Sequence, residues 1–364
     1  MNAENQKIVI DSGSGYTKVG LSGDKNPRVC IPTAIARHSS SAASDLSCLI
    51  MGEEALNPPD EYIINRPISN GIITDWDLME SYWTFIFNDK LNINPEGSSI
   101  FMTEKYGLPT SEREKKAEIL FEKFKTSSIF ISNGATPILW GSRIMSGIVM
   151  DFGYDCTQIV PMRNGFGFKV AVQDCDLGGK DISQYLFTLL SKKNIKRISE
   201  LDLENIKKKF CFCKTSDSSK EEVLKEIEYQ LLDNSKIILG DERFLCTEIF
   251  FTPLFGKGSI FQYFIRSLYE ADKETKSKFP RTVVIAGGNS IFPGLKEEIT
   301  KAFQSYEKLT QKMNIIIKEE REFVQFFGAS EHSAESYINS RLMTRSDYDE
   351  LGAALGVRKK FFYI

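Results

Sequence analysis

The sequence contains few histidines and no long apolar run, and both shortages narrow its possible functions. Only His38 and His332 occur among the 364 residues, and neither lies in a nucleophile motif, so we expect no Ser-His or Cys-His catalysis. No apolar run approaches the roughly 18 residues that a membrane helix needs. The polar residues Met1–Lys7 lead directly into a predicted strand, so we expect neither a signal peptide nor a membrane partner.

An excess of positive charge and a pattern of paired cysteines are also missing. The net charge is -3, whereas a general nucleic-acid binder is usually strongly basic, so we expect no direct nucleic-acid contact. The seven cysteines are scattered and odd in number, which is typical of a reducing compartment. The close pair Cys211 and Cys213 has no second pair that could complete a zinc site. These observations favour a cytoplasmic protein.

Two segments, Ile8–Leu21 and Gly147–Val160, follow the same pattern. Each has a β-branched strand that ends in an aspartate (Asp11 or Asp151), then a tight turn with glycine, then a second strand. A chain of 364 residues is long enough for two lobes, and its composition is 41% hydrophobic and 26% charged, as in globular proteins. One such hairpin in each half therefore predicts a duplicated α/β architecture.

The first turn has the chemistry of an anion site. Gly13 and Gly15 are expected to adopt backbone angles that direct successive N–H groups toward one point, and Lys18 adds a positive charge. Asp11 and Asp151 together could hold Mg²⁺ through water. The alternative is that both segments are ordinary hairpins, but the two acids and the lysine favour phosphate binding. Other phosphate loops fit less well, because there is no GxxxxGK[ST] and no third glycine of a dinucleotide fingerprint.

A third glycine-rich segment, Thr282–Ile299, reads as a buried strand, a turn at Gly287 and Gly288, and a helix that begins near Pro293. Glycines in such a turn let a ligand approach the backbone beside a helix N-terminus.

These three segments, in this order, resemble the phosphate-one, phosphate-two and adenosine motifs of the actin, Hsp70 and sugar-kinase superfamily. Further stretches are similar to actins and actin-related proteins over nearly the whole chain: Arg66–Glu80, Met102–Glu104, Leu177–Asp181, Ile238–Phe244, Phe327–Ser330 and Tyr348–Gly352. The resemblance implies an α/β fold of two lobes, each with a mixed sheet flanked by helices, and a nucleotide cleft between them.

The resemblance also implies domain boundaries. The outer lobe would hold residues 1–141 and 324–364, with subdomain 2 at about 33–65. The inner lobe would hold residues 142–323, with subdomain 4 at about 178–255. The chain would cross between the lobes near Ile138–Ser142 and near Glu322.

By the same resemblance the cofactors are ATP or ADP and Mg²⁺, with Asp11 and Asp151 holding the metal through water. The nucleotide-binding residues it implies are Asp11, Ser12, Gly13, Ser14, Gly15, Tyr16, Lys18, Asp151, Gly153, Tyr154, Gly179, Lys207, Gly287, Gly288 and Phe292.

The chain departs from the family at residues that matter for hydrolysis. Gly134 stands where actins have the glutamine that positions the attacking water, and Gln158 stands where they have a histidine. Orienting water is most of what a protein contributes to phosphoryl transfer to water, so we expect weak or absent hydrolysis and assign no catalytic residue. The second phosphate turn differs too: Tyr154 replaces an acid, and Asp155, which replaces a glycine, would repel phosphate unless it points away or meets a cation.

Two further departures concern self-assembly. The loop at Ser39–Ser44 is rich in serine and alanine where actins have an apolar tip, and the segment at Gly256–Gly258 shortens the family's hydrophobic plug. We therefore expect a subunit bound to actin or actin-related complex subunits, and no conventional homopolymer. A cytoskeletal actin-related protein is favoured. A nuclear subunit of a chromatin-remodelling complex is the alternative, and a phosphotransferase of the sugar-kinase branch lacks support because its acid base and sugar loop have no counterpart.

Overall fold

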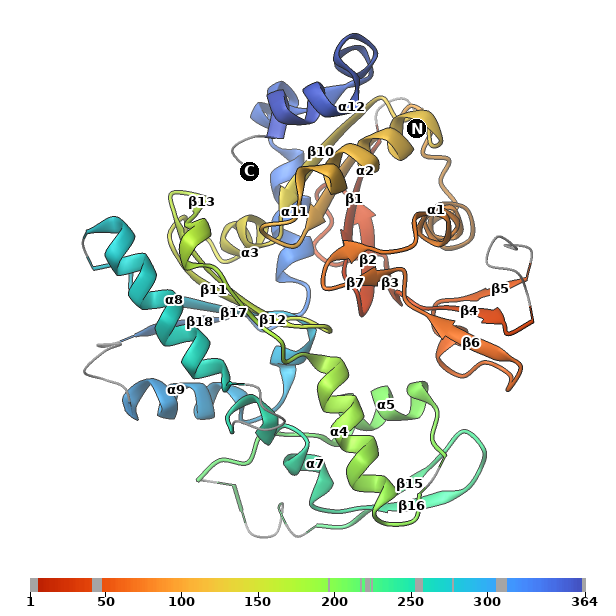
Figure 1. The fold of residues 1–364 in the computed structure, drawn as a ribbon, viewed down its shortest axis with the longest axis vertical. Helices are drawn as coiled ribbons and strands as arrows, with labels where there is room; N and C mark the ends of the chain where they lie inside the picture. The colour runs from red at the N-terminus through yellow and green to blue at the C-terminus, as the bar shows by residue number, and fades with distance from the viewer. Residues whose placement is uncertain are drawn as a thin grey trace.

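The computed structural model describes residues 6–40, 48–195, 197–216, 218–219, 223, 225–252, 258–276, 278–305 and 313–361. Two large mixed β-sheets with flanking helices dominate it (Figure 1). The prediction of an α/β fold with mixed sheets is confirmed. No helix within these described ranges is both long and apolar enough to cross a membrane.

The first sheet, called the outer sheet below, has the strand order β19-β10-β9-β1-β2-β3. Strand β9 pairs in parallel with β1 and β10, and the other pairings are antiparallel. Its strands are β1 (Lys7–Ser12), β2 (Tyr16–Leu21), β3 (Val29–Pro32), β9 (Ser99–Glu104), β10 (Ser128–Asn133) and β19 (Met343–Thr344). Its helices include α1 (Trp76–Phe85), α2 (Thr110–Glu122) and α12 (Arg345–Phe361), which breaks at Gly352 where φ is 71°.

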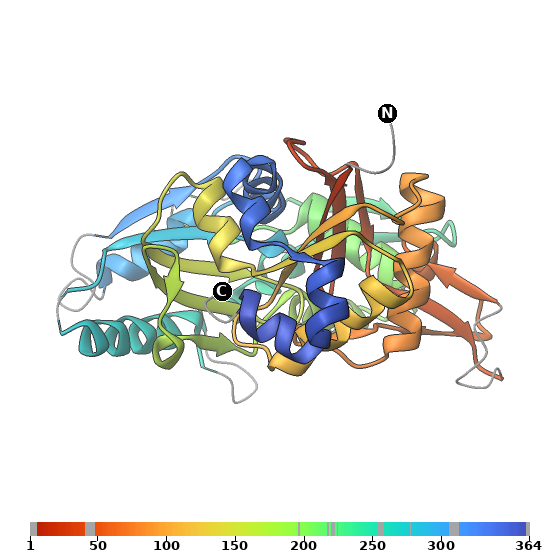
Figure 2. The same cartoon turned by 90° about the horizontal axis from the view of Figure 1, so that it is seen from above.

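The second sheet, called the inner sheet, has the order β13-β12-β11-β17-β18, with β14 also paired to β12. Its strands are β11 (Gly147–Phe152), β12 (Thr157–Arg163), β13 (Phe166–Gly167), β14 (Gln173–Cys175), β17 (Thr282–Ala286) and β18 (Asn314–Ile317). Around it lie α4 (Gly179–Ser191), α5 (Glu200–Phe210), α7 (Glu242–Leu245), α8 (Ile260–Thr275), α9 (Leu295–Ser305) and the hairpin of β15 (Ile227–Gln230) and β16 (Lys236–Leu239). Seen from above, α1 (orange) and α8 (teal) lie at opposite ends of the molecule (Figure 2).

A small three-stranded sheet, β5-β4-β6, projects beside the outer sheet (Figure 1). It consists of β4 (Ile35–His38), β5 (Leu49–Met51) and β6 (Tyr62–Asn65), and the short pair β7 (Ile68–Ser69) and β8 (Ile72–Ile73) follows it. Asp75 then caps α1 by accepting a 3.0 Å hydrogen bond from the backbone N–H of Leu78, which fixes where that helix begins.

Two helices pack against each other where the chain passes between the sheets. Helix α3 (Ala135–Gly141) connects β10 to β11, and α11 (Val324–Ala334) follows β18. Their backbones approach so closely that a Cβ atom on Gly328 would lie 1.9 Å from the carbonyl oxygen of Pro137. The predicted boundaries at 141/142 and 323/324 fall at these helices, and the boundaries themselves stay a prediction.

Two stretches that carried predictions about self-assembly lie largely outside the described residues. Residues 41–47 and 253–257 include most of Ser39–Ser44 and of the segment ending at Gly258.

Candidate functional site

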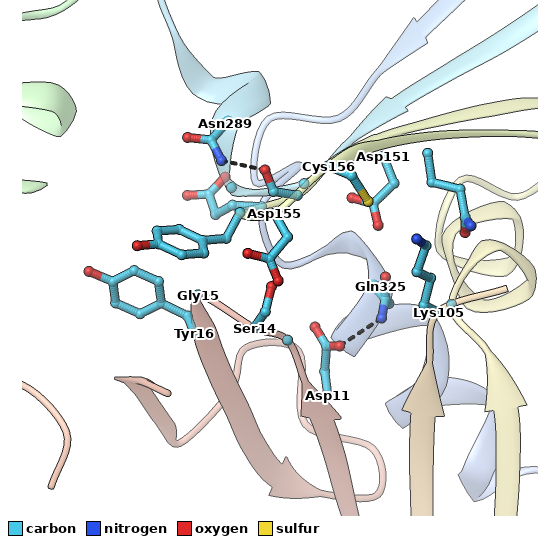
Figure 3. A pocket seen from close by; sticks show the side chains of 18 of the residues that line it. Asp11, Ser14, Gly15, Tyr16, Lys105, Asp151, Asp155, Cys156, Asn289 and Gln325 are labelled. Atoms are coloured by element: carbon cyan, nitrogen blue, oxygen red, sulfur yellow. Dashed lines mark hydrogen bonds between the residues drawn. The ribbon is translucent and has the colours of Figure 1, made fainter. Parts of the chain in front are cut away.

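One cleft of about 360 Å³ lies between the two sheets, and both predicted hairpins open into it (Figure 3). The hairpin β1–β2 enters from the outer sheet, the hairpin β11–β12 from the inner sheet, and the segment after β17 closes a third side. Every predicted nucleotide-binding residue lines this cleft except Gly179. Gly179 lies behind the wall, where a Cβ atom would be 2.4 Å from Nδ2 of Asn289.

The outer hairpin holds its acidic residue firmly. Asp11 is opposite Lys18 in the antiparallel register and opposite Thr103 in the parallel one. Its Oδ2 accepts from Lys18 Nζ at 3.0 Å, and its Oδ1 accepts from Thr103 Oγ1 at 2.8 Å and Gln325 Nε2 at 2.6 Å. Burial alone would lower the pKa of Lys18, but the adjacent Asp11 carboxylate outweighs burial and raises it. Lys18 therefore remains charged beside the expected phosphate position.

The glycines of the outer turn serve a different purpose from the one predicted. Neither Gly13 nor Gly15 has a positive φ, so the prediction of special backbone angles is wrong. Both are instead required by close approach, since a Cβ atom would lie 2.8 Å from the Tyr16 carbonyl oxygen at Gly13 and 2.6 Å from the Tyr154 Cβ at Gly15. A larger residue at Gly15 would push the two hairpins apart, and one at Gly13 would strain the turn of the outer hairpin itself.

The inner hairpin leaves its acidic residue without a partner. Asp151 is opposite Gln158 and Ala286, and within the described residues its carboxylate receives no side-chain hydrogen bond. Burial, reinforced by the nearby Asp11 carboxylate, raises the pKa of Asp151 to about 6, although Lys18 and Lys105 oppose the shift. A half-buried acid with free acceptor capacity beside a second acid suits a divalent cation.

The two aspartates fit Mg²⁺ held through water. No cluster of three or more His, Cys, Asp or Glu side chains occurs in the part of the chain that the structure describes, so a cage of direct protein ligands is not formed there. Mg²⁺ keeps several waters and is usually held by one or two carboxylates together with substrate phosphates. Asp11 and Asp151 would hold the hydrated ion, which would supply charge neutralisation to the phosphates.

Asp155 is turned to protein partners. Its Oδ2 accepts a 2.7 Å hydrogen bond from the backbone N–H of Asn70, and its Oδ1 lies 3.2 Å from Lys180 Nζ. The carboxylate is 8% exposed in this position. Its charge is thus met by a cation and an N–H group, which are the conditions under which it would not repel phosphate.

Aromatic and basic side chains join the two sides at the mouth of the cleft. The Arg66 guanidinium lies 4.4 Å above the centre of the Tyr154 ring and pairs with Glu200 at 2.8 Å. Lys208 Nζ lies 3.9 Å from the centre of the Tyr16 ring and donates to its hydroxyl at 2.6 Å. Contacts that the protein makes on its own therefore bridge the two sides of the cleft.

Lys207 lines the cleft, but its ammonium group is fully engaged. Only 4% of the side chain is exposed, and it donates to Glu204, to Ser183 Oγ at 3.0 Å and to the Gly179 carbonyl at 3.2 Å. An ammonium group has three protons, so these three acceptors use its donor capacity. Lys207 would meet a nucleotide through its hydrocarbon stem.

The double-glycine turn shapes the remaining wall. Gly287 has a φ of 96°, and a Cβ atom there would lie 2.4 Å from Asp151 Oδ1, so glycine is required. Nothing lies within 4 Å of a Cβ atom at Gly288, which faces open space in the cleft. Phe292 is buried, and the helix after the turn begins at Leu295, two residues later than predicted.

The residues tied to hydrolysis also lie in the cleft. The Gln158 amide accepts from the Tyr106 N–H at 3.2 Å and donates to the Tyr106 carbonyl at 3.1 Å and to Asp174 Oδ1 at 2.8 Å. Both of its amide protons are thus taken by protein, which adds to the expectation of slow hydrolysis. Gly134 has no side chain, and the amide of Gln325 lies next to it.

Several cleft residues were missed by the sequence reasoning: Asn70, Lys105, Cys156, Asn289 and Gln325. Cys156 and Asn289 lie inside two of the recognised segments but are not residues that the motifs single out, and Asn70, Lys105 and Gln325 come from outside all three segments. Gln325 in particular reaches the cleft because α11 packs on α3.

A comparison with protein families matches this chain to the family described as Actin, over residues 2–204 and 199–362.

Proposed function

Because this chain belongs to the actin family, we propose that it is an actin-related protein that binds ATP or ADP with Mg²⁺ between its two sheets. It hydrolyses ATP slowly and acts as a structural subunit of a heteromeric protein assembly. The observation that carries this proposal is the pair of hairpins whose aspartates, Asp11 and Asp151, converge on one cleft with Lys18 between them.

Slow hydrolysis is supported by the two departures at the cleft. Gly134 offers no side chain, and the Gln158 amide is committed to Tyr106 and Asp174. Neither can accept a proton from water at neutral pH, so no general base is supplied at these positions.

A role as a subunit of a mixed assembly is supported by the loops that differ from those of filament-forming actins. The sequence around Ser39–Ser44 offers little apolar area to bury, and a weak contact is repeated at every interface of a homopolymer. We propose actin or actin-related subunits as partners, and the cytoskeleton of the cytoplasm as the location.

Equilibrium binding of a labelled ATP analogue to the full-length protein tests the nucleotide site. We expect saturable, Mg²⁺-dependent binding. Absence of saturation at millimolar nucleotide would contradict the proposal.

Affinity purification tests the assembly. We expect actin or actin-related subunits to co-purify, whereas chromatin-remodelling subunits would place the protein in the nucleus. Sedimentation of the pure protein in Mg²⁺-ATP completes the test, because long filaments forming without a partner would contradict a subunit role.

A further inference from the structure

Another residue occupies the space where a side chain on residue 134 would lie. A Cβ atom built on Gly134 would lie 2.8 Å from Oε1 and 2.9 Å from Nε2 of Gln325. Gln325 is the second residue of α11, so it reaches this place from the opposite end of the chain. The amide of Gln325 thus fills the volume that any side chain on residue 134 would enter.

Hydrogen bonds fix which end of this amide faces the cleft. Gln325 Nε2 donates to Asp11 Oδ1 at 2.6 Å (Figure 3) and to Thr103 Oγ1 at 3.0 Å. A carboxylate only accepts, so the nitrogen must face Asp11. No described residue donates to Gln325 Oε1, and the side chain lines the cleft. An oriented acceptor is therefore available beside the predicted phosphate site.

We propose that Gln325 is the residue that orients the attacking water for ATP hydrolysis in this protein. The inference rests on the proposed ATP binding and extends it. Gln325 Oε1 accepts a hydrogen from the water and aims the water oxygen at the γ-phosphorus. The new oxygen–phosphorus bond forms as the bond to the β–γ bridging oxygen breaks, and that electron pair leaves on ADP. A water proton passes to a phosphate oxygen or to solvent, which gives ADP and inorganic phosphate.

The surrounding side chains explain why the reaction would be slow and yet not absent. Gln325 orients water but takes no proton, since an amide is not a base at neutral pH. Gln158 is held by Tyr106 and Asp174, and burial raises the pKa of the Cys156 thiol to about 11, so neither supplies the missing base.

Four forms of the full-length protein test this role: wild type, Gln325→Ala, Gly134→Gln and the double variant. Single-turnover hydrolysis is measured beside ATP affinity and thermal stability. Gln325→Ala is expected to slow hydrolysis about tenfold or more while ATP affinity changes less than about threefold. Gln325→Met, which retains length without an amide, is expected to behave in the same way and controls for lost packing.

Moving the glutamine from position 325 to position 134 adds a measurement, thermal stability, that does not depend on activity. Gly134→Gln alone places two side chains in one volume and is expected to lower the melting temperature. In the Gln325→Ala variant, the side chain introduced by Gly134→Gln has room. The melting temperature should therefore return toward the wild-type value, and hydrolysis should recover with it. Recovery of the melting temperature tests whether the two side chains share one volume, whereas recovery of hydrolysis tests whether a glutamine amide in that volume orients the water.

A crystal structure with Mg²⁺ and a non-hydrolysable ATP analogue gives an independent check. We expect an ordered water within hydrogen-bond distance of Gln325 Oε1, and an Oε1 bonded to protein or analogue instead would overturn the inference. Unchanged hydrolysis in Gln325→Ala, or no hydrolysis by a wild type that binds ATP, would also overturn it and leave ATP binding intact. Absence of ATP binding would contradict both this inference and the proposed function.

Discussion

The hairpins β1–β2 and β11–β12 share one backbone arrangement but treat their acidic residues differently. In the first, the Gly13 N–H bonds the Tyr16 carbonyl at 3.2 Å. In the second, the Gly153 N–H bonds the Cys156 carbonyl at 3.0 Å. Each hairpin also pairs with a parallel strand on its other side, β9 or β17. The duplicated pattern in the sequence is thus a duplicated geometry.

The neighbours of the two aspartates make the difference. Asp11 faces Lys18 and Thr103, both of which donate to it, whereas Asp151 faces Gln158 and Ala286, which do not. The same position in the same backbone therefore carries a carboxylate bound by protein donors on one side and, on the other, an acid without such donors whose pKa is raised to about 6. The outer aspartate is thus paired with a cation of the protein, Lys18, whereas the inner aspartate has acceptor capacity that the proposed Mg²⁺ would use.

The largest expected effect is on ATP affinity, and it comes from changing the residue that lies opposite each aspartate in its hairpin. Lys18→Ala should weaken ATP binding on the order of 100-fold, because it removes the buried charge beside the phosphates and leaves Asp11 repelling them. The matched change Gln158→Ala should alter affinity less than about threefold, since that amide is tied to Tyr106. Titration of a labelled ATP analogue measures both. Equal losses would mean that the two hairpins contribute alike.

A second prediction concerns stability without metal. In EDTA at pH 7.5, Asp151→Asn should stabilise the protein by roughly 2 kcal/mol, because ionising the buried wild-type carboxylate costs free energy. The folded pKa of about 6 lies above the unfolded value, so this cost is present above pH 6 and disappears as pH falls below about 4. About half of the gain should therefore remain at pH 5.

Thermal and denaturant unfolding at pH 7.5 and pH 5 measure the difference in unfolding free energy between Asp151→Asn and the wild type. Asp11→Asn is the control and should destabilise the protein instead, since it weakens the pair with Lys18. A gain that does not shrink between pH 7.5 and pH 5 would show that the stabilisation comes from another property of the introduced amide and not from the lost charge.

A third prediction concerns the turn of the inner hairpin. Asp155→Ala should speed nucleotide release about tenfold, because it removes a charged hydrogen bond to the Asn70 N–H across the cleft mouth. Lys180→Ala is the matched control, since it removes the ion pair of Asp155 and leaves the Asn70 contact in place. Stopped-flow displacement of a fluorescent ATP analogue measures release. Equal acceleration by both changes would assign the effect to the lost charge pair.

The smallest expected effect is on nucleotide release, and it comes from the contact between Tyr16 and Lys208 at the cleft mouth. Tyr16→Phe removes the 2.6 Å hydrogen bond from Lys208 but retains the ring that this ammonium lies above, so release should rise only about twofold. Tyr16→Ala, which removes both contacts, should have the larger effect. Equal acceleration by the two changes in the same displacement assay would show that the ring contact contributes nothing.

Much of the fold and part of the site followed from local sequence patterns. Apolar, β-branched runs that end in Asp11 and Asp151, each followed by a glycine turn, predicted both hairpins, and Gly287-Gly288 predicted the third wall of the cleft. The reason given for Gly15 was wrong, because a sequence does not show that Tyr154 of the other hairpin presses against it, and at Gly13 the close neighbour is the Tyr16 carbonyl of the same turn.

The sequence by itself determined the paired hairpins, the α/β fold and the two acids of the cleft, because β-branched strand residues and turn residues act over a few neighbouring positions. Only the tertiary structure decided that Asp155 meets Asn70, that Lys207 is already satisfied, and that Gln325 fills the space beside Gly134. Each of these contacts joins residues far apart in the chain. The Gln325 contact exists because α3 and α11 pack together where the chain passes between the sheets, and no local pattern records that packing.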